Sequence, residues 1–548
     1  MKMNIKTIIS AIAASLMLSA CVGDLDTLPL NPTDVTSESA YGADEEGYLQ
    51  GLTKIYFQLV SNNKQNLIEG LDGGASELIR AFWSTQEVTA DAAKCAWGDS
   101  WVQDLNNCTW KGDVNNDATY SVYVRTLQGV AYVNEYLRQT SKENLSSRGV
   151  SEEVAAKVEQ YRAEARFLRA FFYWVAMDTF GNVPFSTEDT QFGGGYNPPQ
   201  KPSGDVFNYI VGELEALAAE DSAMPAAQSN YPRADKGSCL GLLARVYLNA
   251  KVYAGVEMFD KAKTTCERIY GLGYKLAPTH AELFRGDNGE NPAAKGEFLF
   301  AAAYDAENTQ SYGGTTYLTL STLNGDDGAV SITGINGGWA GNRVPYAYVQ
   351  KFFPDVQNPD YETGEYTYTD KRASYFYIKG RLEQMGPDPK LLSSFLNGWS
   401  CIKFNNVPHD IEPSAYKSVA ATKNFSDIDW PLIRLGEIHL IYAEACMHEG
   451  GNAQEQLAAL ASRVDATVPS EITEEWLMAE RARELMWEGH RRTDLIRYNK
   501  WTSGYNWTYK GGDFEGIDLP AHFNIFPMPY IELTANQDLI QNPGYAGR

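Results

Sequence analysis

Residues 152–180 constrain the fold most, because apolar side chains recur there at intervals of three or four. This period is typical of an α-helix with one buried face. Phe167, Phe171 and Trp174 add a second apolar face, so the later half of this helix is predicted to be buried nearly all round. Gly181 marks the predicted end of the helix. The chain is therefore expected to fold mainly as α-helices around a shared core.

A helix–turn–helix unit is predicted further along the chain. Asp235 precedes an apolar helical face at residues 240–248, and a second face follows at residues 259–269 after a turn near Gly255. Two helices of about 16 residues joined by a short turn are typical of a tetratricopeptide-type unit. A similar pair of faces recurs at residues 435–464. The spacing predicts a mainly α, tetratricopeptide-like helical-repeat scaffold.

Residues 276–424 differ in character, because Gly, Asn, Pro and Tyr crowd together and no long period survives. This composition predicts loops with short strands. Connections between helices or strands rarely exceed ~15 residues, and this region is far longer. Loop-rich regions of such length are commonly functional. We therefore expect a helical scaffold at 41–275, a long loop-rich insert carrying the binding site at 276–424, and a C-terminal helical scaffold with a closing segment at 425–548.

The N-terminus predicts export and lipidation. Lysines and an apolar stretch at residues 8–18 precede a Leu-Ser-Ala-Cys sequence that ends at Cys21, which is the pattern of a lipoprotein signal. The stretch is only about half as long as the ~20 residues of a transmembrane helix, and no later segment approaches ~18 uninterrupted apolar residues. We expect a signal peptide at 1–20, lipid on Cys21, and a tether at 21–40.

Net charge and cysteine content limit which partners and which kinds of fold are expected. The net charge is −24, and removal of residues 1–20, which carry two lysines and no acid, makes it −26. A nucleic-acid partner is therefore not expected. The six cysteines after Cys21 include no C-x-x-C pair, which argues against a disulfide scaffold. Only Cys95 and Cys108 lie close enough in sequence to merit testing as a disulfide.

Catalytic motifs are missing from the sequence, which has no H-E-x-x-H, G-x-x-x-x-G-K-[ST] or G-x-S-x-G pattern. Paired carboxylates for glycoside hydrolysis remain open, since 70 acidic residues allow many pairs. Binding is better supported, because aromatic rings in exposed loops stack on the apolar faces of sugars. Trp97, Tyr312 and Trp339 lie in Gly- and Asn-rich segments and are selected on this ground.

Seven strings occur in order along nearly the whole mature chain. They are EARFLRA at 164–170, FGNVP at 180–184, PLIRLGE at 431–437, YAEA at 442–445, the segment from Glu480-Arg481 through EGHRRTDL at 488–495, FPMP at 526–529 and QNPGY at 541–545. Together they resemble the signature of the SusD/RagB family of glycan-binding lipoproteins from Bacteroidetes. The resemblance implies the helical-repeat fold of that family.

The resemblance also implies a role. Members of the family capture oligosaccharide at the cell surface and sit as a lid on a SusC-like TonB-dependent transporter, without cleaving the glycan. Asp24 and Asp26 after Cys21 resemble the acidic context of surface-exported members, which implies the outer face of the outer membrane. The charged residues of the strings are expected to form ion pairs between helices instead of ligand contacts. They are Arg434, Glu437, Glu444, Arg481, Glu488 and Arg492.

The order of Trp97, residues 312–317 and Trp339 is similar to that in the starch-binding founding member of the family. In that protein an aromatic arc follows the curve of an α-glucan helix. One departure concerns the position after the first tryptophan, where the founding member has an asparagine. Here either Asp99 or Ser100 takes over its hydrogen bonds, or the specificity differs.

The implied ligand is starch or a malto-oligosaccharide, and the resemblance implies that Arg80 bonds its hydroxyls. Another neutral glycan such as a fructan or β-glucan, a glycoside hydrolase and a peptide-binding repeat scaffold remain alternatives. No cofactor is required. Some members bind Ca²⁺, for which Asp427 with Asp429, or the turn at Asp287, offers oxygen ligands.

Overall fold

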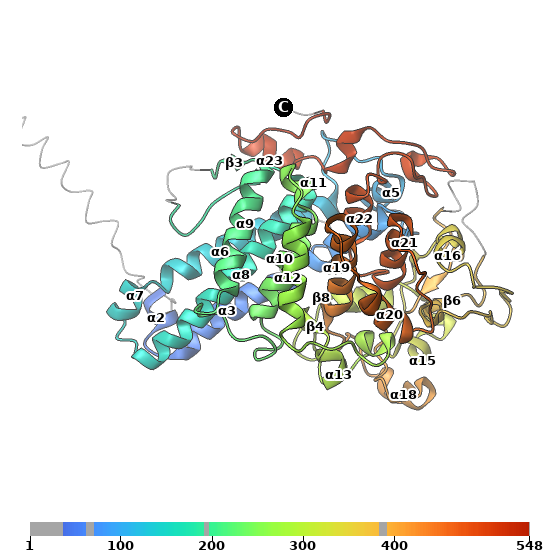
Figure 1. The fold of residues 1–548 in the computed structure, drawn as a ribbon, viewed down its shortest axis with the longest axis horizontal. Helices are drawn as coiled ribbons and strands as arrows, with labels where there is room; N and C mark the ends of the chain where they lie inside the picture. The colour runs from blue at the N-terminus through green and yellow to red at the C-terminus, as the bar shows by residue number, and fades with distance from the viewer. Residues whose placement is uncertain (1–36, 62–70, 191–196, 383–391, 547–548) are drawn as a thin grey trace, which may run out of the picture.

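The computed structural model describes residues 37–61, 71–190, 197–382 and 392–546. Helices dominate and the strands are short, which confirms the predicted fold class. Long helices fill the left half of the molecule in Figure 1, and the right half combines helices from the C-terminal part of the chain with short helices and loops from its middle. Cys21, the signal at 1–20 and most of the tether at 21–40 lie outside the described residues. At the predicted end of the tether, Ser37–Tyr41 forms α2.

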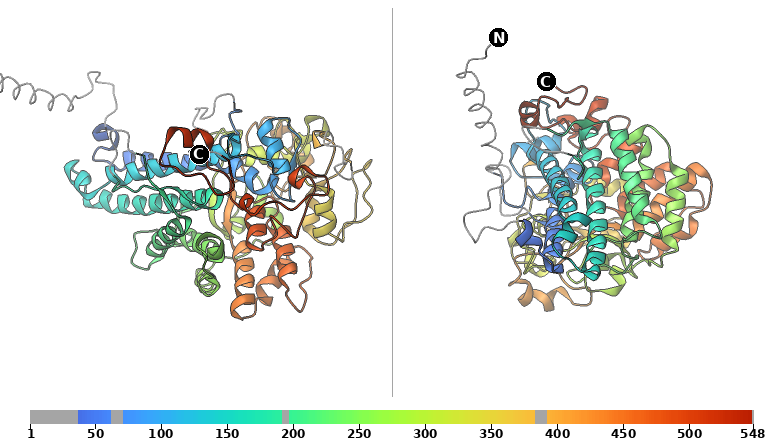
Figure 2. Two further views of the ribbon diagram at one scale, coloured as in Figure 1. Left: turned by 90° about the horizontal axis from the view of Figure 1, so that it is seen from above. Right: turned by 90° about the vertical axis from the view of Figure 1, so that its left-hand side faces the viewer.

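The scaffold is a row of packed helices, which lie side by side in the right-hand view of Figure 2. Neighbours in contact are α3 with α6 and α8, then α6 with α8, α8 with α9, α9 with α10, α10 with α12, and α12 with α19. Their bounds are α3 Glu45–Val60, α6 Asp117–Gln139, α8 Glu152–Phe180, α9 Ser203–Ala218, α10 Lys236–Leu248, α12 Phe259–Tyr270 and α19 Leu435–Glu449.

Helix α8 has the predicted length and burial. The Ser151 hydroxyl accepts the Val154 N–H and caps the first turn, while Gly181, with a φ of 68°, follows the last residue. Phe167, Phe171 and Trp174 are all at most 4% exposed, so the later half is buried on every side as expected.

The predicted helix–turn–helix unit is correct in kind but wrong in length. Asp235 caps α10 in a capping box with Ser238, as its position suggested. Helices α10 and α12 have 13 and 12 residues, shorter than the predicted pair. The difference arises because residues Ala250–Ala254 form a separate short helix, α11, which ends at Gly255 with a φ of 71°. The segment expected to be a simple turn therefore includes the short helix α11.

The C-terminal part adds helices against α19, which packs on α20 and α21. The bounds are α20 Gln454–Ser462, α21 Glu474–Glu484, α22 Arg491–Arg497 and α23 Tyr530–Ala535. In the N-terminal half, three shorter helices complete the set: α4 Leu78–Trp83, α5 Ser100–Asn107 and α7 Lys142–Ser147.

Residues 276–424 carry short helices and strands among loops, as their composition predicted. The helices are α13 Pro292–Lys295, α14 Gly314–Leu320, α15 Ala329–Thr333, α16 Tyr346–Phe352 and α18 Pro413–Ala420. Antiparallel pairs join β1 Lys94–Cys95 to β5 Asn342–Arg343, β2 Val183–Pro184 to β3 Gln200–Lys201, β4 Phe298–Ala302 to β8 Trp430–Arg434, and β6 Phe376–Tyr377 to β7 Ser400–Cys401. Pairs β1–β5 and β4–β8 attach this region to both scaffold blocks.

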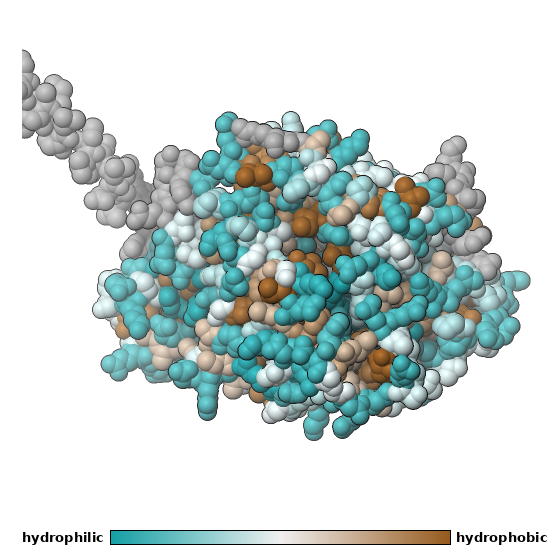
Figure 3. Space-filling model, turned by 45° about the horizontal axis from the view of Figure 1, so that its top comes forward, coloured by the Kyte–Doolittle hydropathy of each residue, from teal (hydrophilic) through white to brown (hydrophobic). Residues whose placement is uncertain are grey.

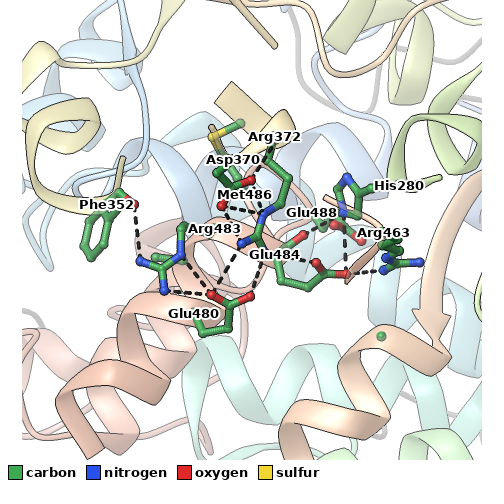
Figure 4. A network of polar contacts seen from close by, with 12 residues as sticks. His280, Phe352, Asp370, Arg372, Arg463, Glu480, Arg483, Glu484, Met486 and Glu488 are labelled. Atoms are coloured by element: carbon green, nitrogen blue, oxygen red, sulfur yellow. Dashed lines mark hydrogen bonds and ion pairs between the residues drawn. The ribbon is translucent and has the colours of Figure 1, made fainter. Parts of the chain in front are cut away.

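A buried ionic network also fixes the loop-rich region to the C-terminal helices (Figure 4). Arg372 pairs with Glu480 at 2.7 Å and with Glu484 at 3.1 Å. Arg434 pairs with Glu484 at 2.7 Å, and Lys403 pairs with Glu488 at 2.6 Å. Burial alone favours a protonated carboxyl, but the surrounding cations, Arg463 foremost, hold the pKa of Glu484 well below its ordinary value.

The charged residues of the family strings mostly form ion pairs, as predicted. Arg434 pairs with Glu488 at 2.7 Å. Glu437, Glu444 and Arg481 pair with Arg245, Arg497 and Asp494, at 2.6, 2.6 and 2.8 Å respectively.

The prediction is wrong for Arg492, which lies among aromatic rings. Its guanidinium carbon is 4.1 Å from the centre of the Trp501 ring and 4.3 Å from that of Phe526. Its Nη2 donates to the Phe523 carbonyl at 2.6 Å. Cation–π contacts and a backbone acceptor replace the expected carboxylate.

The six described cysteines are buried free thiols, so Cys95 and Cys108 form no disulfide. The Sγ of Cys108 instead lies 3.5 Å from the Thr89 carbonyl oxygen. Within the described ranges, no helix combines the length and the apolar character needed to cross a bilayer.

Candidate functional site

The residues selected from the sequence meet at one open cavity of about 620 Å³, which we call the aromatic cavity. Its lining includes all six predicted binding residues, namely Arg80, Trp97, Asp99, Ser100, Tyr312 and Trp339. Four further residues complete the lining: Leu71, Asp72, Trp101 and Asp117. A volume in this range is typical of sites for small ligands.

Strand pairing brings the two tryptophans of the cavity together. Lys94 and Cys95 pair with Arg343 and Asn342, and the Ala96 N–H donates to the Gly341 carbonyl at 2.9 Å. Trp97 follows Ala96 and Trp339 lies two positions before Gly341, so both reach the same cavity although more than 240 positions separate them. Gly341 has no side chain at a point where a Cβ would collide with the Trp97 ring. The close approach of the two segments therefore needs glycine there.

Tyr312 and Trp339 form a wall of aromatic rings. Their ring centres are 5.7 Å apart, and Phe425 extends the row with its centre 5.0 Å from that of Tyr312. Tyr312 is 47% exposed, which leaves much of its ring open to a ligand. On its own side of the cavity, Trp97 packs edge-on against the buried Tyr317 at 5.9 Å. A partly exposed row of rings packed against one another is suited to stacking against sugar rings.

Arg80 is held rigidly at the cavity, with only 2% of its surface exposed. Its Nη1 donates to Asp72 at 2.9 Å and to the Tyr312 carbonyl at 3.2 Å. Its guanidinium carbon lies 4.3 Å from the Tyr317 ring centre and 5.5 Å from that of Trp97. Its Nε has no hydrogen-bond partner among the described residues. A buried donor without a partner costs free energy, but the Nε is itself shielded from solvent and so does not face the cavity directly.

The Tyr312 loop is fixed from below by Glu77, which is fully buried. The Glu77 carboxylate accepts hydrogen bonds from the Tyr304 hydroxyl at 2.6 Å and from the Ser311 hydroxyl. Burial raises the pKa of Glu77 to about 7, although these hydrogen bonds act in the opposite direction. The backbone at Gly74 packs closely against the same loop, since a Cβ there would collide with the Tyr312 carbonyl. Tyr312 is therefore presented on a rigid support.

The polar side of the cavity comes from the starts of two helices. Asp99 and Ser100 open α5, and the exposed Asp99 carboxylate makes no capping hydrogen bond. Asp117 is the first residue of α6, and both partial burial and the charge of Asp99 raise its pKa. The Trp97 carbonyl accepts from Gln103 at 2.5 Å, which ties the loop before α5 to that helix.

Sequence reasoning missed several residues of this site. Trp101 lies four positions after Trp97, so the repeated aromatic was a usable signal. Tyr317 lay within the matched segment 312–317 but was not selected as a binding residue, and Phe425 carried no comparable signal, because its role depends on contacts with residues far away in sequence. Asp72 could be recognised only through its ion pair with Arg80.

The carboxylates proposed for Ca²⁺ have protein partners. Asp427 pairs with Lys423 at 3.0 Å. Asp429 is buried, accepts the Tyr304 N–H at 2.8 Å and the Tyr231 hydroxyl, and has its pKa raised by burial to about 7.

Asp287 accepts hydrogen bonds from the His409 ring at 2.6 Å and backbone at 3.0 Å. Ligand atoms of Asp287, His409 and Asp410 lie within 4.8 Å of one another. Ca²⁺ usually takes about six to eight oxygen ligands, more than this group offers. Binding of Ca²⁺ at any of these positions stays a prediction.

Known proteins resemble this chain along nearly its whole length. A sequence profile of the SusD family matches residues 296–545, and one described as "Starch-binding associating with outer membrane" matches residues 80–231. The starch-binding protein SusD of Bacteroides thetaiotaomicron is 31% identical over 576 aligned residues, which cover 99% of both chains.

Solved structures share the fold. A SusD superfamily protein from Parabacteroides distasonis superposes with a TM-score of 0.68 at 20% identity, covering 93% of this chain and 100% of the other. A laminarin-binding SusD-like protein superposes with a TM-score of 0.62 at 20% identity, covering 92% and 100%. The full-length identity and the two matching profiles establish that the chain belongs to the SusD family.

Proposed function

We propose that this protein binds starch or malto-oligosaccharides in the aromatic cavity and does not cleave them. The proposal rests on the combination of a partly exposed aromatic wall with an Arg80 guanidinium fixed at the same cavity. A curved α-glucan offers apolar ring faces to Tyr312 and Trp339 and hydroxyls to Arg80, Asp99 and Ser100. The relative of 31% identity is named for starch binding, which supports the same ligand class.

The contacts that hold the side chains of the site in place support its affinity for a ligand. Tyr312 is supported by Glu77, and Arg80 is held by Asp72 and two aromatic rings. Preorganised side chains lose little conformational entropy when a ligand binds, so more of the contact energy appears as affinity.

We further propose that lipid on Cys21 anchors the protein to the outer face of the outer membrane, where it delivers glycan to a SusC-like TonB-dependent transporter. Lipidated cysteines with several acyl chains anchor stably, whereas single chains bind marginally. The acidic residues after Cys21 and the membership of the SusD family support this placement. Protease added to intact cells should digest the protein if the placement is correct.

Another neutral glycan is the second candidate ligand. A solved structure with the same fold is described as laminarin-binding, which makes a β-glucan the specific alternative, and a fructan is a further one. A hydrolase remains the third alternative, since retaining and inverting glycosidases need two carboxyl groups and the cavity holds Asp99 and Asp117.

Calorimetry with maltoheptaose, cyclodextrin, laminarihexaose and a short inulin separates these possibilities. We expect saturable binding of maltoheptaose and cyclodextrin, and weak or no binding of the other two. Preference for laminarihexaose or inulin would replace starch with that glycan. Long incubation with amylose should release no reducing ends, and release above that of a boiled control would establish hydrolysis.

A further inference from the structure

The aromatic cavity carries a net negative charge at its lining. Its charged side chains are Asp72, Arg80, Asp99 and Asp117. Asp72 and Arg80 form an ion pair at 2.9 Å, so their charges compensate each other. Asp99 and Asp117 form no ion pair with any lysine or arginine in the described part of the chain. Among the described residues of the lining, two carboxylates therefore remain uncompensated beside the aromatic wall.

Local helix stability does not fully account for these two carboxylates. Acidic residues at helix N-termini are favourable because of the helix dipole. However, the Asp99 side chain accepts no capping hydrogen bond at the start of α5. At α6 the cap is Asn116, whose side chain accepts the N–H groups of Ala118 and Thr119, so Asp117 is not needed for that purpose. Both carboxylates are left to face whatever enters the cavity.

The two carboxylates also act on each other. Asp99 and Asp117 line the same cavity, and partial burial together with the negative charge of Asp99 raises the pKa of Asp117. A ligand bearing a carboxylate, phosphate or sulfate meets this field as a further like charge. Like charges a few ångströms apart at a partly desolvated surface repel appreciably, and salt screens the repulsion.

We propose that Asp99 and Asp117 make the aromatic cavity selective for uncharged glycans over anionic ones. Their oxygens accept hydrogen bonds from the hydroxyls of a neutral sugar, while a sugar carboxylate both repels them and offers them no proton. The inference rests on the proposed function, because it concerns which glycans enter the same cavity.

The test compares maltoheptaose with maltoheptaose oxidised at C6 to carry carboxylates, by calorimetry on the full mature chain. The readout is the ratio of the two Kd values for each protein, because changes in hydroxyl contacts common to both ligands cancel. In low salt we expect the wild type to bind the oxidised sugar at least about tenfold more weakly, or about 1.4 kcal/mol. The ratio should shrink at ~1 M salt, where the screening length is only about 3 Å.

The Asp99→Asn/Asp117→Asn protein should reduce the ratio to below about threefold in low salt. A matched control, Glu152→Gln/Glu153→Gln, removes the same net charge from exposed positions in the first turn of α8 and should keep the wild-type ratio. Asp99→Asn alone, at an exposed position, should give an intermediate ratio if the double variant does not fold.

Equal binding of both sugars by the wild type, or a ratio that the Asp→Asn changes leave intact, would overturn the charge selectivity while leaving glycan capture in place. If maltoheptaose does not bind, the α-glucan proposal fails, and the comparison is repeated with laminarihexaose and its oxidised form. Failure of every neutral glycan to bind would overturn both proposals.

Discussion

Replacing Glu484 by Ala tests whether the buried ionic network fixes the loop-rich region to the scaffold. The Glu484 side chain is fully buried and contacts Arg434 at 2.7 Å, Arg372 at 3.1 Å and Arg463. Among the described residues, the network has five cations and five anions, so its charges balance. They are Arg372, Lys403, Arg434, Arg463 and Arg483 against Glu297, Asp370, Glu480, Glu484 and Glu488.

The Glu484→Ala change leaves one buried positive charge without its partner. Removing one member of a buried ion pair costs roughly 3–5 kcal/mol, because the remaining charge stays desolvated. Domains are stable by only about 5–15 kcal/mol, so the loss is a large fraction of the total. Glu484→Gln keeps the shape of the side chain without its charge and should be almost as destabilising. Glu267→Ala, at an exposed position on α12, is the control and should change little.

Urea denaturation followed by tryptophan fluorescence measures these differences from the midpoints and slopes. Limited proteolysis provides a second measurement, since a loosened network should expose residues 276–424 to cleavage before the helical scaffold. A stability loss below ~1 kcal/mol for Glu484→Ala, with an unchanged cleavage pattern, would refute the reasoning. It would mean that the three arginines are solvated or paired in other ways once the carboxylate is gone.

Three further predictions concern the aromatic cavity. Trp339→Ala should weaken maltoheptaose binding by more than ~1 kcal/mol in calorimetry, because it removes a ring of the stacking wall, and an unchanged affinity would place the site elsewhere. Gly74→Ala should also weaken binding, since its Cβ would displace the Tyr312 backbone, whereas Gly98→Ala, with open space around its Cβ, is the matched control and should bind as wild type. In the folded protein the pKa of Glu77 is raised to about 7 from its ordinary value of 4.5. The contribution of Glu77 to the stability of the protein is therefore complete below pH 4.5 and is lost as the pH rises through 7. Glu77→Gln should therefore lose less stability than the wild type between about pH 5 and pH 8, and parallel pH profiles would contradict this assignment.

Features that depend on neighbours in sequence could be predicted from the sequence alone. The period of apolar residues in α8, its capping serine and its terminal glycine all act within a few residues of each other. The same holds for Asp235, which caps the helix that follows it. The loop-rich character of residues 276–424 also follows from local composition. Lengths were less predictable, since α11 adds a helical turn where only a turn was expected.

Which residues meet in space was decided by the tertiary structure. The aromatic residues of the site could be selected as candidates, but pairing of β1 with β5 is what brings Trp97 and Trp339 to one cavity. Phe425 joins the wall, and Arg492 lies among rings instead of pairing with a carboxylate, only because of contacts between distant segments. Surface hydropathy is no simple guide to the contacts between segments either, since apolar and polar residues are mixed over the face shown in Figure 3.

The sequence by itself therefore determined the helical scaffold, the family and the kinds of side chain available for binding. The tertiary structure alone decided how those side chains combine. It leaves Asp99 and Asp117 without cationic partners in the described part of the chain and gives Arg80 a carboxylate and two rings. The physical reason is that helix formation depends on interactions a few residues apart, whereas a binding cavity depends on packing between segments that only the complete fold brings together.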